Sequence, residues 1–192
     1  MSINIYTIKH PLVLHWSSYL SNPSISIGNK NEVSNKVYLA LLYEASRRSL
    51  DVTRLYIKYF SKTQEISLIS RTKCYLFCSD IHISHEINKD AKYLIPNILV
   101  KQILLDFENN QWKILKAHSM LPVNLTESQV IILEHQLNTK RLRPVIEYIL
   151  QCASYDVPIQ ICCYICKQVE LESLSNQYPK LEIYTCIIDD KV

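Results

Sequence analysis

The second half of the chain alternates strand-like and helix-like segments, and this order constrains the fold more than any other feature. The continuous apolar run 130–133 predicts a strand buried on both faces, and 159–165 and 181–188 predict two further strands. Helices are predicted between them, one opening at Pro144 and a shorter one over 169–176. Strands joined by short helical crossovers form right-handed parallel units. The sequence therefore predicts an α/β fold with a mostly parallel, twisted sheet flanked by helices.

The first half shows a weaker pattern of the same kind. Apolar residues at helical spacing predict a helix from a cap at 29–31 to Arg48, and a second helix is predicted to open at Pro96. The second of these helices carries Ile98, Leu99, Ile103 and Leu104. Strands are predicted at 52–60, 65–69, 74–78 and 112–116.

Length and composition limit the classes of protein to which the chain can belong. The 192 residues are 48% hydrophobic and 20% charged and contain no linker or repeat, so we expect one globular domain over 1–192. No apolar run approaches the roughly 20 residues that span a bilayer, so no membrane association is expected. The net charge of +3 comes from scattered residues, so nucleic acid is not expected as a partner.

One glycine, Gly28, stands in a chain rich in Ile, Asn, Lys, Ser and Tyr. That bias is typical of translation from an AT-rich genome. The start shows neither a secretory signal nor the Arg-rich character of a transit peptide. We therefore expect the protein in the plastid (chloroplast) stroma, with a bacterial cytoplasm as the alternative.

Four segments, in order, carry a resemblance to a known family. The stretch 10–15 has the order His-Pro-Leu-Val-Leu-His, and 41–45 has Leu-Leu-Tyr-Glu-Ala. Met-Leu-Pro at 120–122 precedes the first buried strand, and 178–189 ends in Tyr-Thr and Ile-Asp. In these segments the chain resembles uracil phosphoribosyltransferase. The resemblance implies that family's fold, and it implies self-association, so a homo-oligomer or another protein partner is expected.

The motif that grips phosphoribosyl pyrophosphate in this family is poorly matched. The family has roughly Asp-Pro-x-Leu-Ala-Thr-Gly-Gly-Ser, and the register places residues 134–142 there. Glu134 and Thr139 keep the character of the motif, but Lys140 and Arg141 replace its two glycines. Backbone N–H groups that cradle a phosphate need conformations and close approaches that a Cβ atom obstructs.

Two further family features differ. Where the family has Pro-Ile-Leu-Arg-Ala-Gly, the segment 78–83 lacks the arginine and glycine and carries Asp80, which would repel a polyanion. The given sequence ends at 190–192, where the family continues into a loop that recognises uracil. We therefore expect a degenerate homologue without transferase activity, catalytic residues or cofactor. The alternative is a divergent uracil phosphoribosyltransferase, which would use Mg²⁺ and phosphoribosyl pyrophosphate to make UMP.

The only local basic cluster suggests a weaker alternative, a module that binds phosphate or RNA. Lys140, Arg141 and Arg143 are predicted on a loop just ahead of a helix. Basic side chains oppose the helix dipole at that point, which indicates that an anion compensates them. The competing interpretation is a solvated loop.

Two groups of residues are of metal-ligand type, but the positions of their cysteines on predicted strands favour a role in packing over metal binding. Cys74, Cys78, His82 and His85 are of zinc-ligand type, but residues four apart on a strand lie about 13 Å from each other. The cysteines within 162–166 lie inside a predicted buried strand. No metal site is expected.

Overall fold

The computed structural model describes residues 3–22, 24, 26–69, 72–119, 122–153 and 157–189. At its centre lies a six-stranded sheet in which every neighbouring pair of strands is parallel. In spatial order its strands are β1 (Asn4–Thr7), β10 (Glu182–Asp189), β9 (Ile159–Lys167), β8 (Gln129–Gln136), β4 (Cys74–Cys78) and β5 (Ile98–Gln102). The predicted parallel sheet is therefore confirmed, and its second half follows the predicted strand–helix order.

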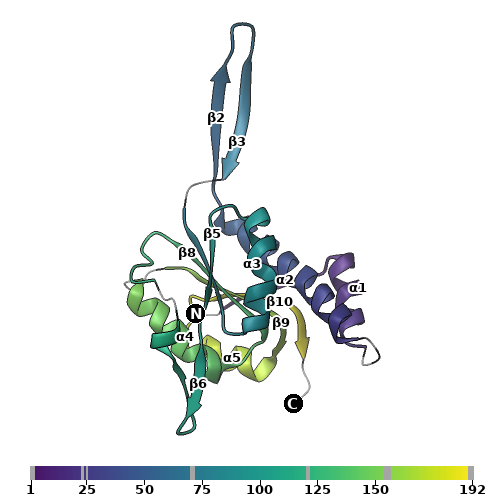
Figure 1. The fold of residues 1–192 in the computed structure, drawn as a ribbon, viewed down its shortest axis with the longest axis vertical. Coiled ribbons are helices and arrows are strands. Elements are labelled where there is room, and N and C mark those ends of the chain that lie inside the picture. The colour runs from purple at the N-terminus through teal and green to yellow at the C-terminus, as the bar shows by residue number, and fades with distance from the viewer. Residues whose placement is uncertain are drawn as a thin grey trace.

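Helices cover both faces of the sheet (Figure 1). One face packs against α1 (Pro11–Leu20), α2 (Ile27–Ser49) and α3 (Ile81–Leu94). The other packs against α4 (Thr139–Cys152) and α5 (Gln168–Gln177). Among the described residues, none of these helices is long and apolar enough to cross a bilayer.

The core has two halves, one on each face of the sheet. Ile131 and Leu133 of β8 join the cluster under α2, whereas Val130 and Ile132 join the cluster under α4. All four are essentially excluded from solvent. Successive strand residues point to opposite faces, so the continuous apolar run that predicted this strand fills both halves at once.

Two hairpins stand outside the main sheet. The strands β2 (Val52–Lys58) and β3 (Thr63–Ile69) pair only with each other and form an arm that projects away from the body (Figure 1). The second hairpin joins β6 (Leu105–Glu108) to β7 (Gln111–Ile114), and a short 3-10 helix, Lys116–His118, follows it. Asn109 and Asn110 turn this hairpin with positive φ angles of 51° and 64°, as in the tight turns that suit the twist of paired strands.

Three predicted helix starts are wrong. The residues 29–31, expected to cap a helix, lie inside α2, whose N-cap is Ser26. The residues after Pro96 form β5, because the apolar run 98–100 pairs with β4 at the edge of the sheet and is too short for its period to distinguish strand from helix. The helix predicted to open at Pro144 begins at Thr139 instead. There Asn138 caps the first turn, and Pro144 lies inside the helix.

Candidate functional site

The segments that correspond to the two family phosphate motifs lie side by side. Cys78 of β4 is paired with Leu133 of β8, so both strands end at the same edge of the sheet. Ser79 and Asp80 follow β4 directly, and Glu134 lies near the end of β8. In open α/β sheets this carboxyl edge is where ligands bind.

The connection from β8 to α4 is short and closed by its own side chains. Leu137 is buried, and the Asn138 side chain accepts a hydrogen bond of 3.1 Å from the Arg141 backbone N–H. The helix therefore begins at Thr139. Lys140, Arg141 and Arg143 lie on this helix, not on a loop ahead of it as the sequence predicted.

A carboxylate from elsewhere in the chain sits at the start of α4. The Thr139 backbone N–H donates to Glu170 Oε2 over 2.6 Å, and the Thr139 hydroxyl donates to the Glu170 carbonyl over 3.1 Å. Glu170 belongs to the first turn of α5. The Glu170 carboxylate therefore lies at the positive end of the α4 dipole.

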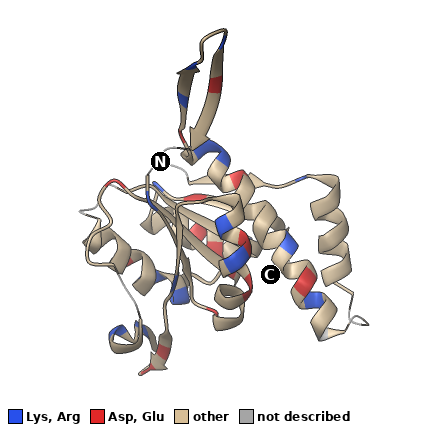
Figure 2. Ribbon diagram, turned by 45° about the horizontal axis from the view of Figure 1, so that its top comes forward, with Lys and Arg blue, Asp and Glu red and all other residues tan. Residues whose placement is uncertain are grey.

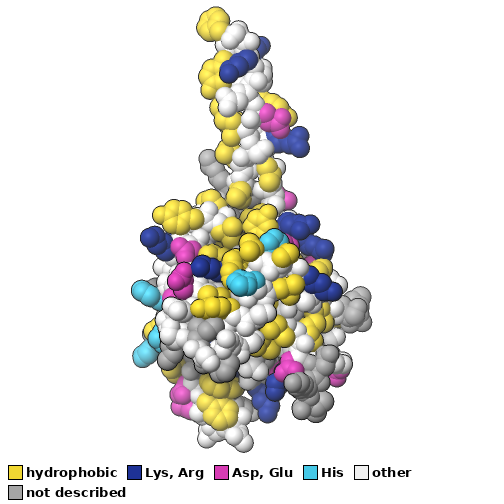
Figure 3. Space-filling model, turned by 90° about the vertical axis from the view of Figure 1, so that its right-hand side faces the viewer, with side chains coloured by type: hydrophobic (Ala, Val, Ile, Leu, Met, Phe, Trp, Pro, Cys, Tyr) yellow, Lys and Arg dark blue, Asp and Glu magenta, His cyan; other side chains and the backbone are white. Residues whose placement is uncertain are grey.

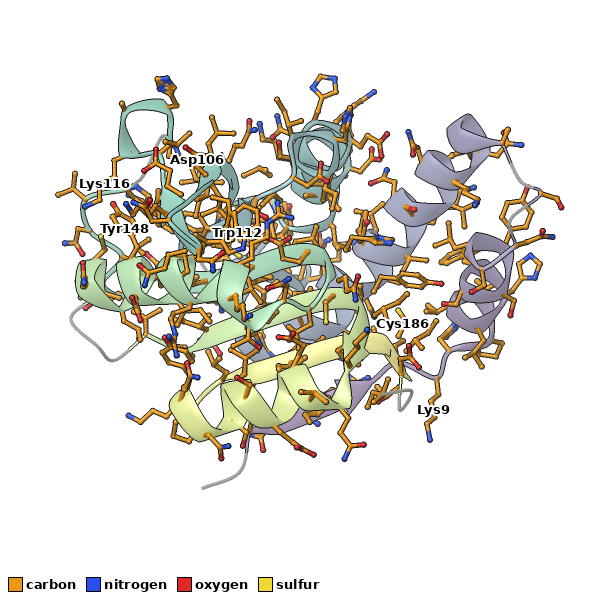
Figure 4. The ribbon with its side chains drawn as sticks, turned by 90° about the horizontal axis from the view of Figure 1, so that it is seen from below. Lys9, Asp106, Trp112, Lys116, Tyr148 and Cys186 are labelled. Atoms are coloured by element: carbon orange, nitrogen blue, oxygen red, sulfur yellow. The ribbon has the colours of Figure 1, made fainter. Side chains whose placement is uncertain are left out.

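The Arg141 side chain crosses from α4 to the segment after β4. Its Nη2 atom donates to the Ser79 carbonyl over 3.3 Å, and its guanidinium lies 5.7 Å from the centroid of the Trp112 ring. Its Nε is buried and has no hydrogen-bond partner among the described residues. The residue that replaces a family glycine therefore occupies the space between the two motif segments. Figure 4 shows Trp112 along the same side of α4 as Tyr148 and Lys116.

Glu134, the residue in the place of the family's aspartate, is turned inward. It is 4% exposed, and the Ser79 hydroxyl donates a hydrogen bond to its Oε1. Burial raises the pKa of Glu134, while the Ser79 hydrogen bond and the charge of Arg141 act against that rise. The carboxylate is thus held by groups of the chain itself.

Asp80 caps the helix that follows β4. Its Oδ1 accepts from the backbone N–H groups of His82 and Ile83, over 2.8 and 3.4 Å. The chain's own oxygens therefore accept from backbone N–H groups at the starts of α3 and α4, two of the helices that begin at this edge.

A cavity of about 440 Å³ remains at the edge, and we call it the loop cavity. Its charged lining residues are Asp80, Glu134, Arg141, Lys167 and Glu170. Three carboxylates against two cations disfavour a polyanion, because like charges repel strongly where water is partly excluded. The backbone N–H groups of Thr139 and Arg141 already donate to Glu170 and Asn138, so the residues present fit that substrate poorly.

The other basic residues of the predicted cluster face a different cavity. Lys140 and Arg143 line a hollow of about 690 Å³ between the β6–β7 turn, α4 and α5, which we call the outer cavity. The Arg143 guanidinium donates from Nε and Nη2 to Gln177 Oε1, over 3.1 and 2.6 Å. The structure therefore places Lys140 and Arg143 in one cavity and Arg141 in the other.

Sequence reasoning missed Glu170, Trp112 and a histidine–tyrosine pair beside the edge. The Tyr38 hydroxyl lies 2.9 Å from Nδ1 of His135, and burial lowers the pKa of His135. The acidic residue in the first turn of α5 was visible in the sequence, but nothing there placed it beside Thr139.

The cysteines of the two predicted metal-ligand groups are buried in the sheet. Cys74 and Cys78 are fully buried in β4, and Cys162, Cys163 and Cys166 are fully buried in β9. His82 and His85 are exposed on α3. In the part of the chain that the structure describes, no three His, Cys, Asp or Glu side chains come together in a way that could hold a metal ion.

Solved structures share this fold. A protein from Aquifex aeolicus, AQ2163, superposes with a TM-score of 0.77 at 16% identity, covering 96% of this chain and 87% of the other. A hypoxanthine-guanine phosphoribosyl transferase from L. donovani gives a TM-score of 0.52 at 11% identity, covering 85% and 82%. At such identities the likeness shows the fold alone, and that fold is the phosphoribosyltransferase fold.

Comparison of the sequence with those of known proteins identifies the family. The chain is 23% identical to a uracil phosphoribosyltransferase homolog of Pyropia yezoensis, over 100% of this chain and 91% of that protein. It is 22% identical to the uracil phosphoribosyltransferase of Staphylococcus aureus (strain Newman), over 98% and 88%. The family model for uracil phosphoribosyltransferase matches residues 7–192. The chain therefore belongs to the uracil phosphoribosyltransferase family.

Proposed function

We propose that the chain is a member of this family without transferase activity, which acts by binding protein and in the first place a second copy of itself. One observation carries the loss of activity. The Glu170 carboxylate holds the Thr139 N–H, where the family's loop would hold a phosphate. The Arg141 side chain stands between the two motif segments.

Phosphoribosyl transfer depends on positioning and on donors aimed at charged oxygens. At this edge those donors bind Glu170, Asn138 and Asp80. A pyrophosphate would have to displace these groups and then lie beside the buried Glu134. Each displaced charge-assisted hydrogen bond costs about 1.5–3 kcal/mol, so binding and catalysis are both opposed.

The competing function is a divergent enzyme that converts uracil and phosphoribosyl pyrophosphate to UMP. It is tested by incubating the protein with labelled uracil, phosphoribosyl pyrophosphate and Mg²⁺ and separating UMP by chromatography. The Staphylococcus aureus uracil phosphoribosyltransferase serves as the positive control. We expect no UMP above the blank. UMP formed in proportion to the amount of protein would overturn the proposal.

A function in RNA binding is not favoured by the charge distribution. Lys140 and Arg143 face the outer cavity and Arg141 faces the loop cavity, so the three residues do not make one patch. Figure 2 shows basic and acidic residues interspersed over the body and on the arm. A phosphate backbone is bound by a stripe of one sign.

Self-association is supported by the arm. Nearly every residue of β2 and β3 is exposed, including the large side chains of Leu55, Tyr56 and Leu68, and Tyr59 and Phe60 are exposed in the turn between the two strands. Figure 3 shows hydrophobic side chains along the arm and on the body beneath it. A two-stranded hairpin alone is marginally stable in water, and an exposed apolar patch of this kind is typical of an interface. The resemblance to a self-associating family makes a second copy our proposed partner.

The plastid stroma remains our proposal for the location, with a bacterial cytoplasm as the alternative. The proposal rests on the composition of the chain. It is checked by identifying the genome that encodes the reading frame. A nuclear gene with a plastid presequence would also place the protein in the stroma, whereas a bacterial chromosome would establish the alternative.

A further inference from the structure

The six-stranded sheet has an open side at β1. Among the described strands, β1 pairs with β10 alone. The N–H groups of Asn4 and Ile8 donate to carbonyls at and just before β10, over 3.3 and 2.9 Å. Because backbone groups alternate along a strand, the N–H and C=O groups of Ile5 and Thr7 point away from β10. An edge strand with free backbone groups is a template on which another extended chain can pair.

A hollow of about 480 Å³ lies beside this strand, and we call it the β1 groove. Both residues with outward backbone groups, Ile5 and Thr7, are among its lining residues. The lining also includes Lys9 and His10, which follow β1, and Glu44, Arg47 and Arg48 of α2. The free side of β1 therefore has room beside it and polar side chains around it.

The β1 groove is basic. Lys9 and Arg47 are exposed, and Figure 4 shows Lys9 pointing away from the body. Arg48 is held by Tyr6, whose hydroxyl accepts from Nη1 over 2.6 Å and whose ring centroid lies 4.2 Å from the guanidinium carbon. Glu44 is the one carboxylate among the lining residues, and it is paired with Arg47 over 3.3 Å. Three cations against one carboxylate favour an acidic occupant.

We propose that β1 binds an extended acidic segment of a partner protein, which joins the sheet as a further strand along the β1 groove. Main-chain hydrogen bonds to Ile5 and Thr7 hold the added strand. Its side chains point alternately to the two faces of the sheet, so every second one meets Lys9, Arg47 or Arg48. The partner segment therefore carries acidic residues at alternate positions. The inference goes beyond the proposed function, because this partner is not a second copy of the chain.

A second copy fits the β1 groove poorly. Two β1 strands paired about a two-fold axis would bring the same cations of both copies together, and like charges oppose association. The arm of a second copy would do the same, since it carries Arg54, Lys58 and Lys62 against Glu65 alone. Charge therefore separates the β1 groove from the self-association that we propose for the arm.

The test is a fluorescence anisotropy titration of a labelled peptide in which Glu and Val alternate over about eight residues. We expect saturable binding by wild type, and binding at least about tenfold weaker when Lys replaces Glu in the peptide. The variant Lys9→Gln with Arg47→Gln should bind the acidic peptide at least about fivefold more weakly. The matched control is Lys89→Gln with Lys92→Gln, which removes two exposed cations from α3 and should bind like wild type.

A proline substitution tests the strand pairing separately from the charge. Ile5→Pro removes an outward N–H and no hydrogen bond to β10, and an edge strand tolerates proline at such a position. We expect it to weaken peptide binding about tenfold, whereas Ile5→Ala keeps the N–H and should bind like wild type. Hydrogen exchange at the amides of Ile5 and Thr7 should slow when the peptide is added to wild type.

Folding of every variant is checked by circular dichroism and a urea transition, and Thr7→Pro replaces Ile5→Pro if the latter does not fold. No saturable binding of the acidic peptide contradicts the inference, and so does equal binding of the lysine peptide. Unchanged exchange at Ile5 and Thr7 in the complex would show that the peptide does not pair with β1. A dimer that dissociates in Lys9→Gln with Arg47→Gln would assign the β1 groove to a second copy and overturn the proposal.

Discussion

Among the side chains at the carboxyl edge of the sheet, we expect removal of Arg141 to lower the free energy of unfolding most. Its guanidinium donates to the Ser79 carbonyl, lies over the Trp112 ring and opposes the charge of the buried Glu134. The variant Arg141→Met keeps a long apolar side chain in the half-buried position and removes the charge and the donors. It therefore isolates the electrostatic part of the contact.

The expected loss in the free energy of unfolding can be estimated from these contacts. A hydrogen bond from a charged donor contributes about 1.5–3 kcal/mol, and a guanidinium over an aromatic ring about 0.5–1 kcal/mol at a partly exposed site. The contacts share one side chain, so the terms overlap. We expect Arg141→Met to lower the free energy of unfolding by about 2–3 kcal/mol.

The loss should also depend on pH. Burial raises the folded-state pKa of Glu134 above its unfolded value, so the folded chain binds the proton more readily than the unfolded chain does. The stabilisation that protonated Glu134 gives the folded state is complete at pH values below the pKa of Glu134 in the unfolded chain. It is lost as the pH rises toward the pKa of Glu134 in the folded chain. Without Arg141 the folded pKa rises further. The deficit of the variant should therefore be larger at about pH 8 than at about pH 5.

Urea denaturation of wild type, Arg141→Met, Glu134→Gln and the double variant completes a mutant cycle. We expect a coupling of about 1–3 kcal/mol between the two sites, with the double variant more stable than the sum of the single losses predicts. Losses that add within about 0.5 kcal/mol would refute the reasoning. So would a deficit that does not change with pH.

The remaining predictions concern the cap, the core and the arm. Asn138→Ala should lower the free energy of unfolding by about 1 kcal/mol, because the Arg141 N–H loses its acceptor; an unchanged urea midpoint would contradict this. Phe77→Ala should cost about 3–5 kcal/mol by leaving a cavity in a fully buried position, and a loss below about 1 kcal/mol would contradict the described core. Tyr56→Ser with Phe60→Ser should raise the dimer dissociation constant in sedimentation equilibrium by about tenfold or more, because exposed aromatic residues are typical interface anchors. The control Lys62→Ser, in the same turn, should leave it unchanged.

The sheet was predictable where strands are buried on both faces. The run 130–133 is continuously apolar because each residue packs on one helix layer or the other, and 159–165 is apolar except for the buried Gln160. The short strands at the edges gave no such pattern, so β1 was not predicted and β5 was taken for a helix. The missed helix α3 had a visible cue, because Asp80 precedes Ile83, Ile87 and Ala91 at helical spacing.

The candidate site was predictable only in part. Register placed Glu134, Thr139, Lys140 and Arg141 near one another, and the structure shows them at the end of β8 and the start of α4. The sequence could not show that Glu170 reaches Thr139, because this contact depends on how α5 packs beside α4. Asp80 was expected to repel an anion; the structure adds that it caps α3. The residues 190–192, on which the predicted loss of the uracil loop rests, lie outside the described residues.

The most direct test of the account is a calorimetric titration of the wild-type protein with phosphoribosyl pyrophosphate in the presence of Mg²⁺. The account predicts no saturable heat at millimolar ligand, because the chain's own side chains hold the donors at the start of α4. The Staphylococcus aureus relative, titrated in the same buffer, shows that the ligand and conditions are sound. Saturable binding in the micromolar range would contradict the central claim.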